Sequence, residues 1–142
     1  MVKIILIIFL ISFNASASNI LIKSSNVIRI YDGDTFFANI EGWPDIVGKN
    51  IGIRINGIDT PEIRGKCIEE ISKAKEARAA LVSLIYSSSN IELRNIKRGK
   101  YFRLVADVFA NDKNVADYLI NKKLAIPYDG GTKENFCLNK ND

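Results

Sequence analysis

Two short stretches of this sequence, residues 31–35 and 54–62, carry the side chains best suited to chemistry. They hold four carboxylates and one arginine, namely Asp32, Asp34, Asp59, Glu62 and Arg54. A protein gathers like charges in one place only if a positive group joins them, because their repulsion and desolvation are otherwise costly. A hard divalent cation prefers such oxygen ligands, and an arginine beside it suits a phosphate. The spacing therefore predicts a site for a metal ion and a phosphate.

A second group of charges is basic and lies later in the chain, between residues 94 and 103. Its members are Arg94, Lys97, Arg98, Lys100 and Arg103. The whole sequence has a formal net charge of +4, which is a mild bias toward a polyanionic partner. A solvated surface face would explain the cluster equally well, so charge alone leaves both interpretations open.

The sequence contains no histidine. This excludes Ser-His-Asp and Cys-His catalysis, and it excludes nucleases that use a histidine as base or acid. The two cysteines alone cannot complete a zinc site, so zinc is disfavoured as well. Any chemistry has to rely on carboxylates, arginine, lysine, tyrosine and a metal ion.

The first 17 residues have the pattern of a secretory signal peptide. Lys3 precedes an apolar run over residues 4–13, and a small-x-small cleavage pattern ends at Ala17. A membrane span needs about 20 apolar residues, and this run is about half as long. We therefore expect a single domain over residues 18–142 that is secreted or periplasmic and has no stable membrane association after cleavage.

The two cysteines, Cys67 and Cys137, both lie in the expected mature chain. An even count in an exported protein predicts a disulfide between them. Closing so long a loop would stabilise the fold by about 4 kcal/mol in the chain-entropy model. Two buried free thiols are the alternative, which an oxidising compartment disfavours.

Hydrophobic periodicity predicts five strands and two helices. The strands are expected at residues 20–30, 34–40, 51–56, 91–94 and 101–110, the helices at 68–86 and 115–122, and a loop at 41–50. Turn residues follow the last helix. Five strands with one helix after the third and another after the last favour a small closed barrel, which removes exposed strand edges.

The expected strands place both arginines of interest opposite an apolar face. Arg54 alternates with isoleucines, and Arg103 alternates with a row that runs from Phe102 to Ala110. Pro61 favours an extended residue before it, so residues 59–62 should form a rigid bend after the strand. Such a bend could direct the carboxylates on either side of Pro61 into one site.

Three motifs in this order resemble the staphylococcal-nuclease-like (thermonuclease) family. They are Asp32-Gly33-Asp34-Thr35, then Arg54-x-x-Gly57-x-Asp59-Thr60-Pro61-Glu62, then Lys100-Tyr101-x-Arg103-Leu104-x-Ala106. The match covers roughly residues 27–128. The resemblance implies a mainly β OB-fold, a five-stranded barrel with helices. It also implies a calcium-dependent phosphodiesterase that acts on single-stranded DNA or RNA and leaves 3′-phosphates.

The resemblance also implies roles for single residues. Asp34, Asp59 and the carbonyl of Thr60 would bind Ca²⁺, with Asp32 supporting them. Glu62 would orient or deprotonate the attacking water, and Arg54 and Arg103 would bind the scissile phosphate. Because arginine is too basic to donate a proton efficiently, the role of both is mainly electrostatic. The expected nucleotide contacts are Lys100, Tyr101 and Tyr128, although partly buried packing would explain the two tyrosines equally well.

Two departures from the family pattern stand out. Phe102 occupies the position where the family commonly has glycine, and the chain stops soon after Tyr128 without a long C-terminal helix. A bridge from Cys137 to Cys67 would hold the short tail in place. The alternative function is a catalytically inactive OB-fold module that binds single-stranded nucleic acid. A third class, an exported OB-fold that binds a protein or sugar, would leave the carboxylates and arginines unexplained. We expect a monomer.

Overall fold

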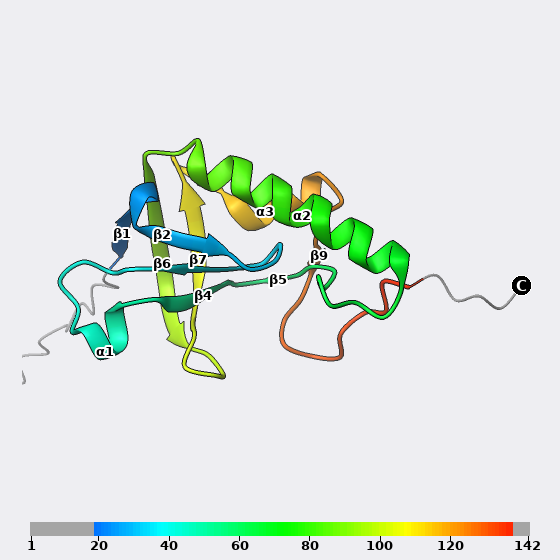
Figure 1. The fold of residues 1–142 in the computed structure, drawn as a ribbon, viewed down its shortest axis with the longest axis horizontal. Helices are drawn as coiled ribbons and strands as arrows, with labels where there is room; N and C mark the ends of the chain where they lie inside the picture. The colour runs from blue at the N-terminus through cyan, green and yellow to red at the C-terminus, as the bar shows by residue number, and fades with distance from the viewer. Residues whose placement is uncertain (1–18, 138–142) are drawn as a thin grey trace, which may run out of the picture.

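The computed structural model describes residues 19–137, in which a curled β-sheet packs against helices (Figure 1). The predicted signal peptide lies outside the described residues. The sheet has the strand order β1-β6-β7-β4-β3-β2, with β8 beside β7. Its strands are β1 (Ile20–Lys23), β2 (Val27–Ile30), β3 (Thr35–Ala38), β4 (Ile51–Ile55), β6 (Asn90–Arg98), β7 (Leu104–Ala110) and β8 (Lys113–Asn114).

The two edge strands of the sheet are neighbours in the sequence. A 3-10 turn at Ser24–Asn26 separates β1 from β2, so the strand predicted at residues 20–30 is interrupted. The first half pairs with β6 and the second half with β3. One bent segment therefore bridges both edges of the curled sheet, which confirms the mainly β, OB-fold barrel with helices.

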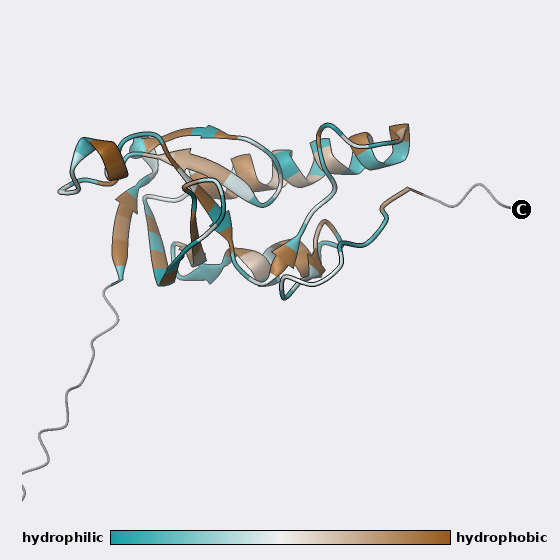
Figure 2. Cartoon of the chain, turned by 90° about the horizontal axis from the view of Figure 1, so that it is seen from below, coloured by the Kyte–Doolittle hydropathy of each residue, from teal (hydrophilic) through white to brown (hydrophobic). Residues whose placement is uncertain are grey.

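The helices are α1 (Asp45–Gly48), α2 (Ile68–Tyr86) and α3 (Val115–Asn121). The two longer helices confirm the prediction, whereas α1 forms inside the segment predicted as a loop. The buried stripe of α2 begins at Ala74, and Ile68 is 82% exposed, contrary to its expected place in the stripe. Figure 2 shows hydrophobic residues along the strands and polar residues alternating with them along the long helix.

The barrel core follows from alternation along the strands. Every second side chain of β7, from Leu104 to Ala110, is buried, and those between them are only partly buried. Phe36, Ile53 and Leu93 are fully buried opposite them. At about 25 cal/mol per Å² of apolar surface, each such side chain contributes about 1.5–3 kcal/mol. The side chains of β4 and β7 that alternate with the core residues project from the opposite face of the sheet. That face is therefore not used for packing the core.

The last predicted strand begins later than expected, at Leu104 instead of residue 101. Tyr101 and Phe102 have φ angles of +56° and +61°, because the chain reverses direction there between β6 and β7. Phe102 is 56% exposed and so lies outside the apolar row in which the sequence placed it. Arg103 immediately precedes the strand.

The C-terminal segment is held against the barrel at two points. Strand β9 (Ile126–Pro127) pairs with β5 (Ile58–Asp59), and a disulfide joins Cys67 to Cys137 with their Cα atoms 5.9 Å apart. The predicted pairing of the cysteines is confirmed. The disulfide therefore keeps residues 128–137 beside the bend that follows β5.

No helix within the described residues is both long and apolar enough to cross a lipid bilayer.

Candidate functional site

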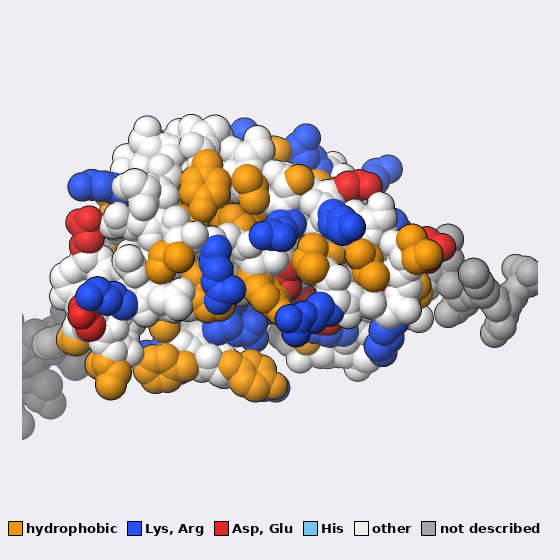
Figure 3. All heavy atoms as spheres, in the orientation of Figure 1, with side chains coloured by type: hydrophobic (Ala, Val, Ile, Leu, Met, Phe, Trp, Pro, Cys, Tyr) orange, Lys and Arg blue, Asp and Glu red, His pale blue; other side chains and the backbone are white. Residues whose placement is uncertain are grey.

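A cleft of about 700 Å³ brings most of the predicted site residues together. Figure 3 shows a small acidic area near the middle of this face, with lysine and arginine side chains around it. Asp59 lies beneath the cleft wall and is only 1% exposed. The predicted residues that line the cleft are Asp32, Asp34, Arg54, Thr60, Glu62, Lys100, Tyr101, Arg103 and Tyr128.

Arg54 connects the two carboxylates predicted to bind a metal ion. Its Nη1 lies 2.5 Å from Asp34 Oδ2, and its Nη2 lies 3.3 Å from Asp59 Oδ1. The same Nη2 donates a hydrogen bond to the carbonyl oxygen of Ile58 at 3.1 Å. Burial lowers the pKa of Arg54, but the charge of Asp34 and the hydrogen bond to it raise the pKa above its ordinary value. Arg54 therefore stays charged.

The turn before Asp34 depends on glycine because of space. A Cβ atom at Gly33 would lie 2.7 Å from Cβ of Ala77 and 2.9 Å from Cγ2 of Thr60. The φ angle of Gly33 is not positive, so space and not backbone conformation is the reason for glycine at this position. Close packing of the turn against α2 and Thr60 thus places Asp34 next to the bend. The hydroxyl of Thr35 then donates to Asp34 Oδ1 at 2.7 Å.

Asp32 lies beside Asp34, in surroundings that disfavour its charged form. Burial, and then the negative charge of Asp34, raise the pKa of Asp32 to about 7. Three buried side-chain polar atoms of residues 19–137 have no hydrogen-bond partner: Asp32 Oδ1, Thr60 Oγ1 and Arg94 Nε. Two of the three lie at the acidic part of the cleft. Buried polar atoms without partners are costly, so this place favours an additional ligand.

The residues there offer the hard oxygen atoms that a divalent cation prefers. Asp34 and Asp59 are 5% and 1% exposed, and the carbonyl of Thr60 adds a third oxygen. Among the described residues, Cys67, Glu70 and Cys137 are the one group of three candidate ligands within 4.8 Å of one another, and its sulfurs form the disulfide. The site thus offers two carboxylates that share Arg54, and the carbonyl, water and a phosphate oxygen would complete the coordination of a cation.

Arg103 reaches the same cleft from the turn between β6 and β7. Its side chain lies across Gly52, where a Cβ atom would be 2.9 Å from Arg103 Cγ. Its Nε donates to the carbonyl of Lys100 at 3.4 Å, and its guanidinium lies 5.6 Å from the centre of the Tyr101 ring. Both predicted arginines therefore line one cleft.

The expected nucleotide contacts come from two different segments, and each of the two tyrosine rings lies near one of the two arginines. Lys100 and Tyr101 are exposed on the β6–β7 turn, and Tyr101 is 88% exposed. Tyr128 is partly buried, with Arg54 5.8 Å from its ring centre, and its hydroxyl donates to the carbonyl of Gly131. The exposure of Tyr101 leaves its ring free to stack, whereas part of Tyr128 is used for packing.

Lys133 is a site residue that the sequence did not reveal. Its Nζ lies 3.1 Å from Asp59 Oδ1 and 2.9 Å from Glu62 Oε1. No motif marks this lysine, because β9 and the disulfide carry it to the cleft from the C-terminal segment. Glu62 is also held through its backbone, since Glu70 accepts from its N–H at 3.5 Å.

We expect Lys133→Gln to raise the affinity for Ca²⁺. A unit charge about 4 Å from a carboxylate contributes on the order of several kcal/mol at the effective dielectric of a protein surface, so removing this competing cation should lower the Kd at least about fivefold. Isothermal titration calorimetry in the absence of substrate measures the Kd for Ca²⁺. Lys100→Gln is the matched control, because Lys100 lines the cleft without an ion pair to these carboxylates. An unchanged Kd for Lys133→Gln would contradict the expectation.

The curled barrel and its acidic and basic cleft define an OB-fold protein built to hold a charged ligand. The family model for staphylococcal nuclease homologues matches residues 52–140, so the chain belongs to that family. It is also similar to a probable endonuclease of Schizosaccharomyces pombe, with 30% identity over 82% of this chain. The match covers 60% of that relative, so this chain spans about three fifths of its length.

Proposed function

We propose that this protein is an exported, calcium-dependent nuclease that hydrolyses DNA and RNA and leaves 3′-phosphates. The observation that supports it most is the meeting of Arg54 and Arg103 in one cleft with the buried carboxylate of Asp34. Two guanidiniums can bind a phosphodiester from two sides and stabilise the charge that grows on its oxygens. Membership of a nuclease family agrees with this chemistry.

The proposed reaction uses a water molecule that Glu62 orients or deprotonates. The water oxygen forms a bond to phosphorus, the bond from phosphorus to the 5′ oxygen breaks, and that oxygen leaves as a hydroxyl after taking a proton from solvent. Asp34, Asp59 and the carbonyl of Thr60 would hold Ca²⁺. When bound, calcium would act as a Lewis acid toward a phosphoryl oxygen. Asp32 would support these ligands.

Arg54 is already engaged by carboxylates before a phosphate binds. In the structure its two terminal nitrogens contact Asp34 and Asp59. A phosphate would share this guanidinium, which has five N–H donors, with the two carboxylates. Arg103 has no ion pair among the described residues and can contact a phosphate without such competition. The two arginines thus differ before a phosphate binds, because Arg54 is ion-paired and Arg103 is not.

Export is proposed from two independent features. The pattern of residues 1–17 is that of a signal peptide, and the disulfide between Cys67 and Cys137 is stable in an oxidising compartment. We propose a secreted or periplasmic monomer that acts on single-stranded nucleic acid.

The test is an incubation of the exported protein with single-stranded DNA or RNA, in calcium and in excess chelator. We expect cleavage in calcium and none in chelator, and end-group analysis of the products should find 3′-phosphates. Binding of the strand without cleavage in either condition would favour the inactive nucleic-acid-binding module. If the protein neither binds nor cleaves the strand, both the proposed function and its alternative are wrong.

A further inference from the structure

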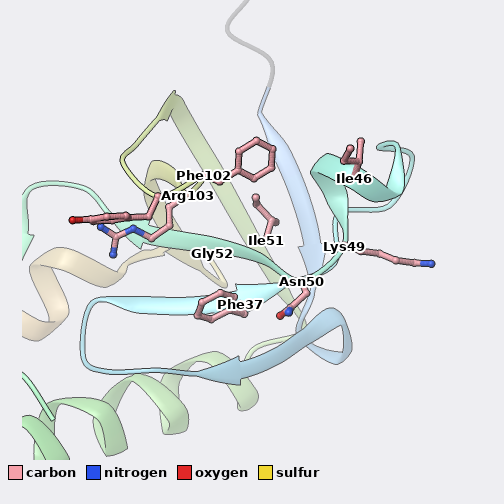
Figure 4. A pocket seen from close by; sticks show the side chains of 9 residues that line it. Phe37, Ile46, Lys49, Asn50, Ile51, Gly52, Phe102 and Arg103 are labelled. Atoms are coloured by element: carbon pink, nitrogen blue, oxygen red, sulfur yellow. The ribbon is translucent and has the colours of Figure 1, made fainter. Parts of the chain in front are cut away.

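A second hollow of about 280 Å³ lies directly beside the cleft (Figure 4). Its walls come from the end of α1 and the start of β4 on one side and from the β6–β7 turn on the other. Phe37, Ile46 and Phe102 supply apolar surface, and Lys49 adds a positive charge. Tyr101 and Arg103 also line it, but none of the residue roles assigned above uses its apolar part.

This hollow is called the side pocket from here on. Two of its large apolar side chains are exposed to solvent. Ile46 is 84% exposed and Phe102 is 56% exposed. In Figure 3, hydrophobic side chains gather at the edge of the molecule formed by α1 and the β6–β7 turn. Large exposed apolar groups that lie together mark a binding surface more often than single ones do.

The backbone at Phe102 adds an independent observation. Its φ of +61° is a left-handed conformation that is unfavourable for a residue with a bulky side chain. Glycine would adopt this turn without strain, yet the chain keeps an aromatic ring there and presents it to solvent. Strain retained at an exposed position favours a functional role.

The side pocket is continuous with the cleft that we propose binds the scissile phosphate. Tyr101 and Arg103 line both hollows. Figure 4 shows the Arg103 side chain at the opposite end of the side pocket from Ile46. A nucleic-acid strand whose phosphate binds Arg103 would therefore place a neighbouring nucleotide at the side pocket.

The charges around the side pocket suit a nucleic-acid strand better than an apolar partner. The guanidinium of Arg98 lies 4.7 Å from the ring centre of Phe102, and that of Arg29 lies 3.9 Å from the ring centre of Phe37. Aromatic rings that are interleaved with cations are the usual surface for single-stranded nucleic acid, because bases stack on the rings and phosphates pair with the cations.

We propose that the side pocket binds one base of the single strand, in a nucleotide adjacent to the scissile phosphodiester. The inference rests on the proposed function and extends it: the protein prefers strands long enough to occupy the cleft and the side pocket together. Phe102 supplies the stacking surface, and Ile46 forms the opposite wall.

The experiment compares kcat/KM for a dinucleotide and an octanucleotide in calcium. We expect the parental protein to prefer the octanucleotide, and we expect Phe102→Ala to reduce that preference about 5- to 150-fold, the range for one stacked base. Ile46→Ala should reduce it in the same direction, whereas Phe102→Tyr should retain it. Ile68→Ala is the matched control, because Ile68 is 82% exposed on α2, outside both hollows.

An unchanged length preference in both alanine variants would overturn the side-pocket proposal while leaving the nuclease intact. Sedimentation could also show that the parental protein self-associates and that the two alanine variants do not. If these variants keep the length preference at the same time, the side-pocket proposal is wrong and a second copy of the chain is the occupant. If no strand is cleaved, fluorescence anisotropy with labelled octanucleotide in chelator gives a separate result. Weaker binding by Phe102→Ala would then support the side pocket although the proposed catalysis had failed.

Discussion

Arg103→Ala should lower kcat/KM for calcium-dependent cleavage by about 10³-fold or more, the scale found for arginines that stabilise a phosphoryl transition state. The polar contacts of the Arg103 side chain among the described residues are with the Lys100 carbonyl and the Tyr101 ring, so removing it leaves no carboxylate unpaired. The loss should therefore appear in activity and not in the melting temperature. Cleavage of a labelled octanucleotide and circular dichroism measure the two effects.

Arg54→Ala should lower kcat/KM by a similar factor, but it should also lower stability. Its guanidinium holds the buried carboxylates of Asp34 and Asp59, which would be left without that counter-charge. Arg54→Lys should not restore activity, because an ammonium cannot contact a carboxylate and a phosphate in the same planar arrangement.

Arg94→Ala is the matched control for both arginines. Arg94 forms an ion pair with Glu92 and lies over the ring of Phe109, and none of these three residues lines the cleft. It should keep nearly parental activity. A variant at residue 54 or 103 that cleaves as fast as Arg94→Ala, with a native circular dichroism spectrum, would contradict the role proposed for that arginine.

Local patterns were enough to predict the barrel elements that present the site. Alternation along residues 51–55 fixed the side of β4 from which Arg54 projects, and the apolar spacing of residues 68–86 predicted α2. Both patterns arise from burial of one face of an element, which neighbours in the sequence determine. This is why Arg54 could be assigned to the face of its strand opposite the isoleucines from the sequence alone.

Features that depend on contacts between distant segments could not be predicted in this way. Lys133 reaches Asp59 only because β9 pairs with β5 and the disulfide holds the tail. The need for glycine at position 33 comes from Ala77, which is far along the chain. The predicted strand at residues 101–110 extended too far into the β6–β7 turn, because a left-handed Phe102 contradicts the local preference of phenylalanine.

Asp34→Ala should abolish the stabilisation of the fold by Ca²⁺. A ligand at 100 times its Kd stabilises a protein by about 2.7 kcal/mol, which a thermal melt resolves clearly. Asp34 is 5% exposed and contacts both Thr35 and Arg54, so its carboxylate is held in a fixed position at the acidic part of the cleft. We therefore expect the calcium-dependent rise in melting temperature to disappear in this variant.

The metal-free melting temperature of Asp34→Ala depends on two opposing effects. Removing this carboxylate relieves its repulsion of Asp32, whose pKa is raised by burial and then by the charge of Asp34. It also deprives Arg54 of its shortest ion pair, so the gain in metal-free stability should be small. Glu92→Gln is the control, because it removes a paired carboxylate outside the cleft and should leave the response to calcium intact. If Asp34→Ala still responds to calcium as the parental protein does, the ion binds elsewhere and the proposed ligand set is wrong.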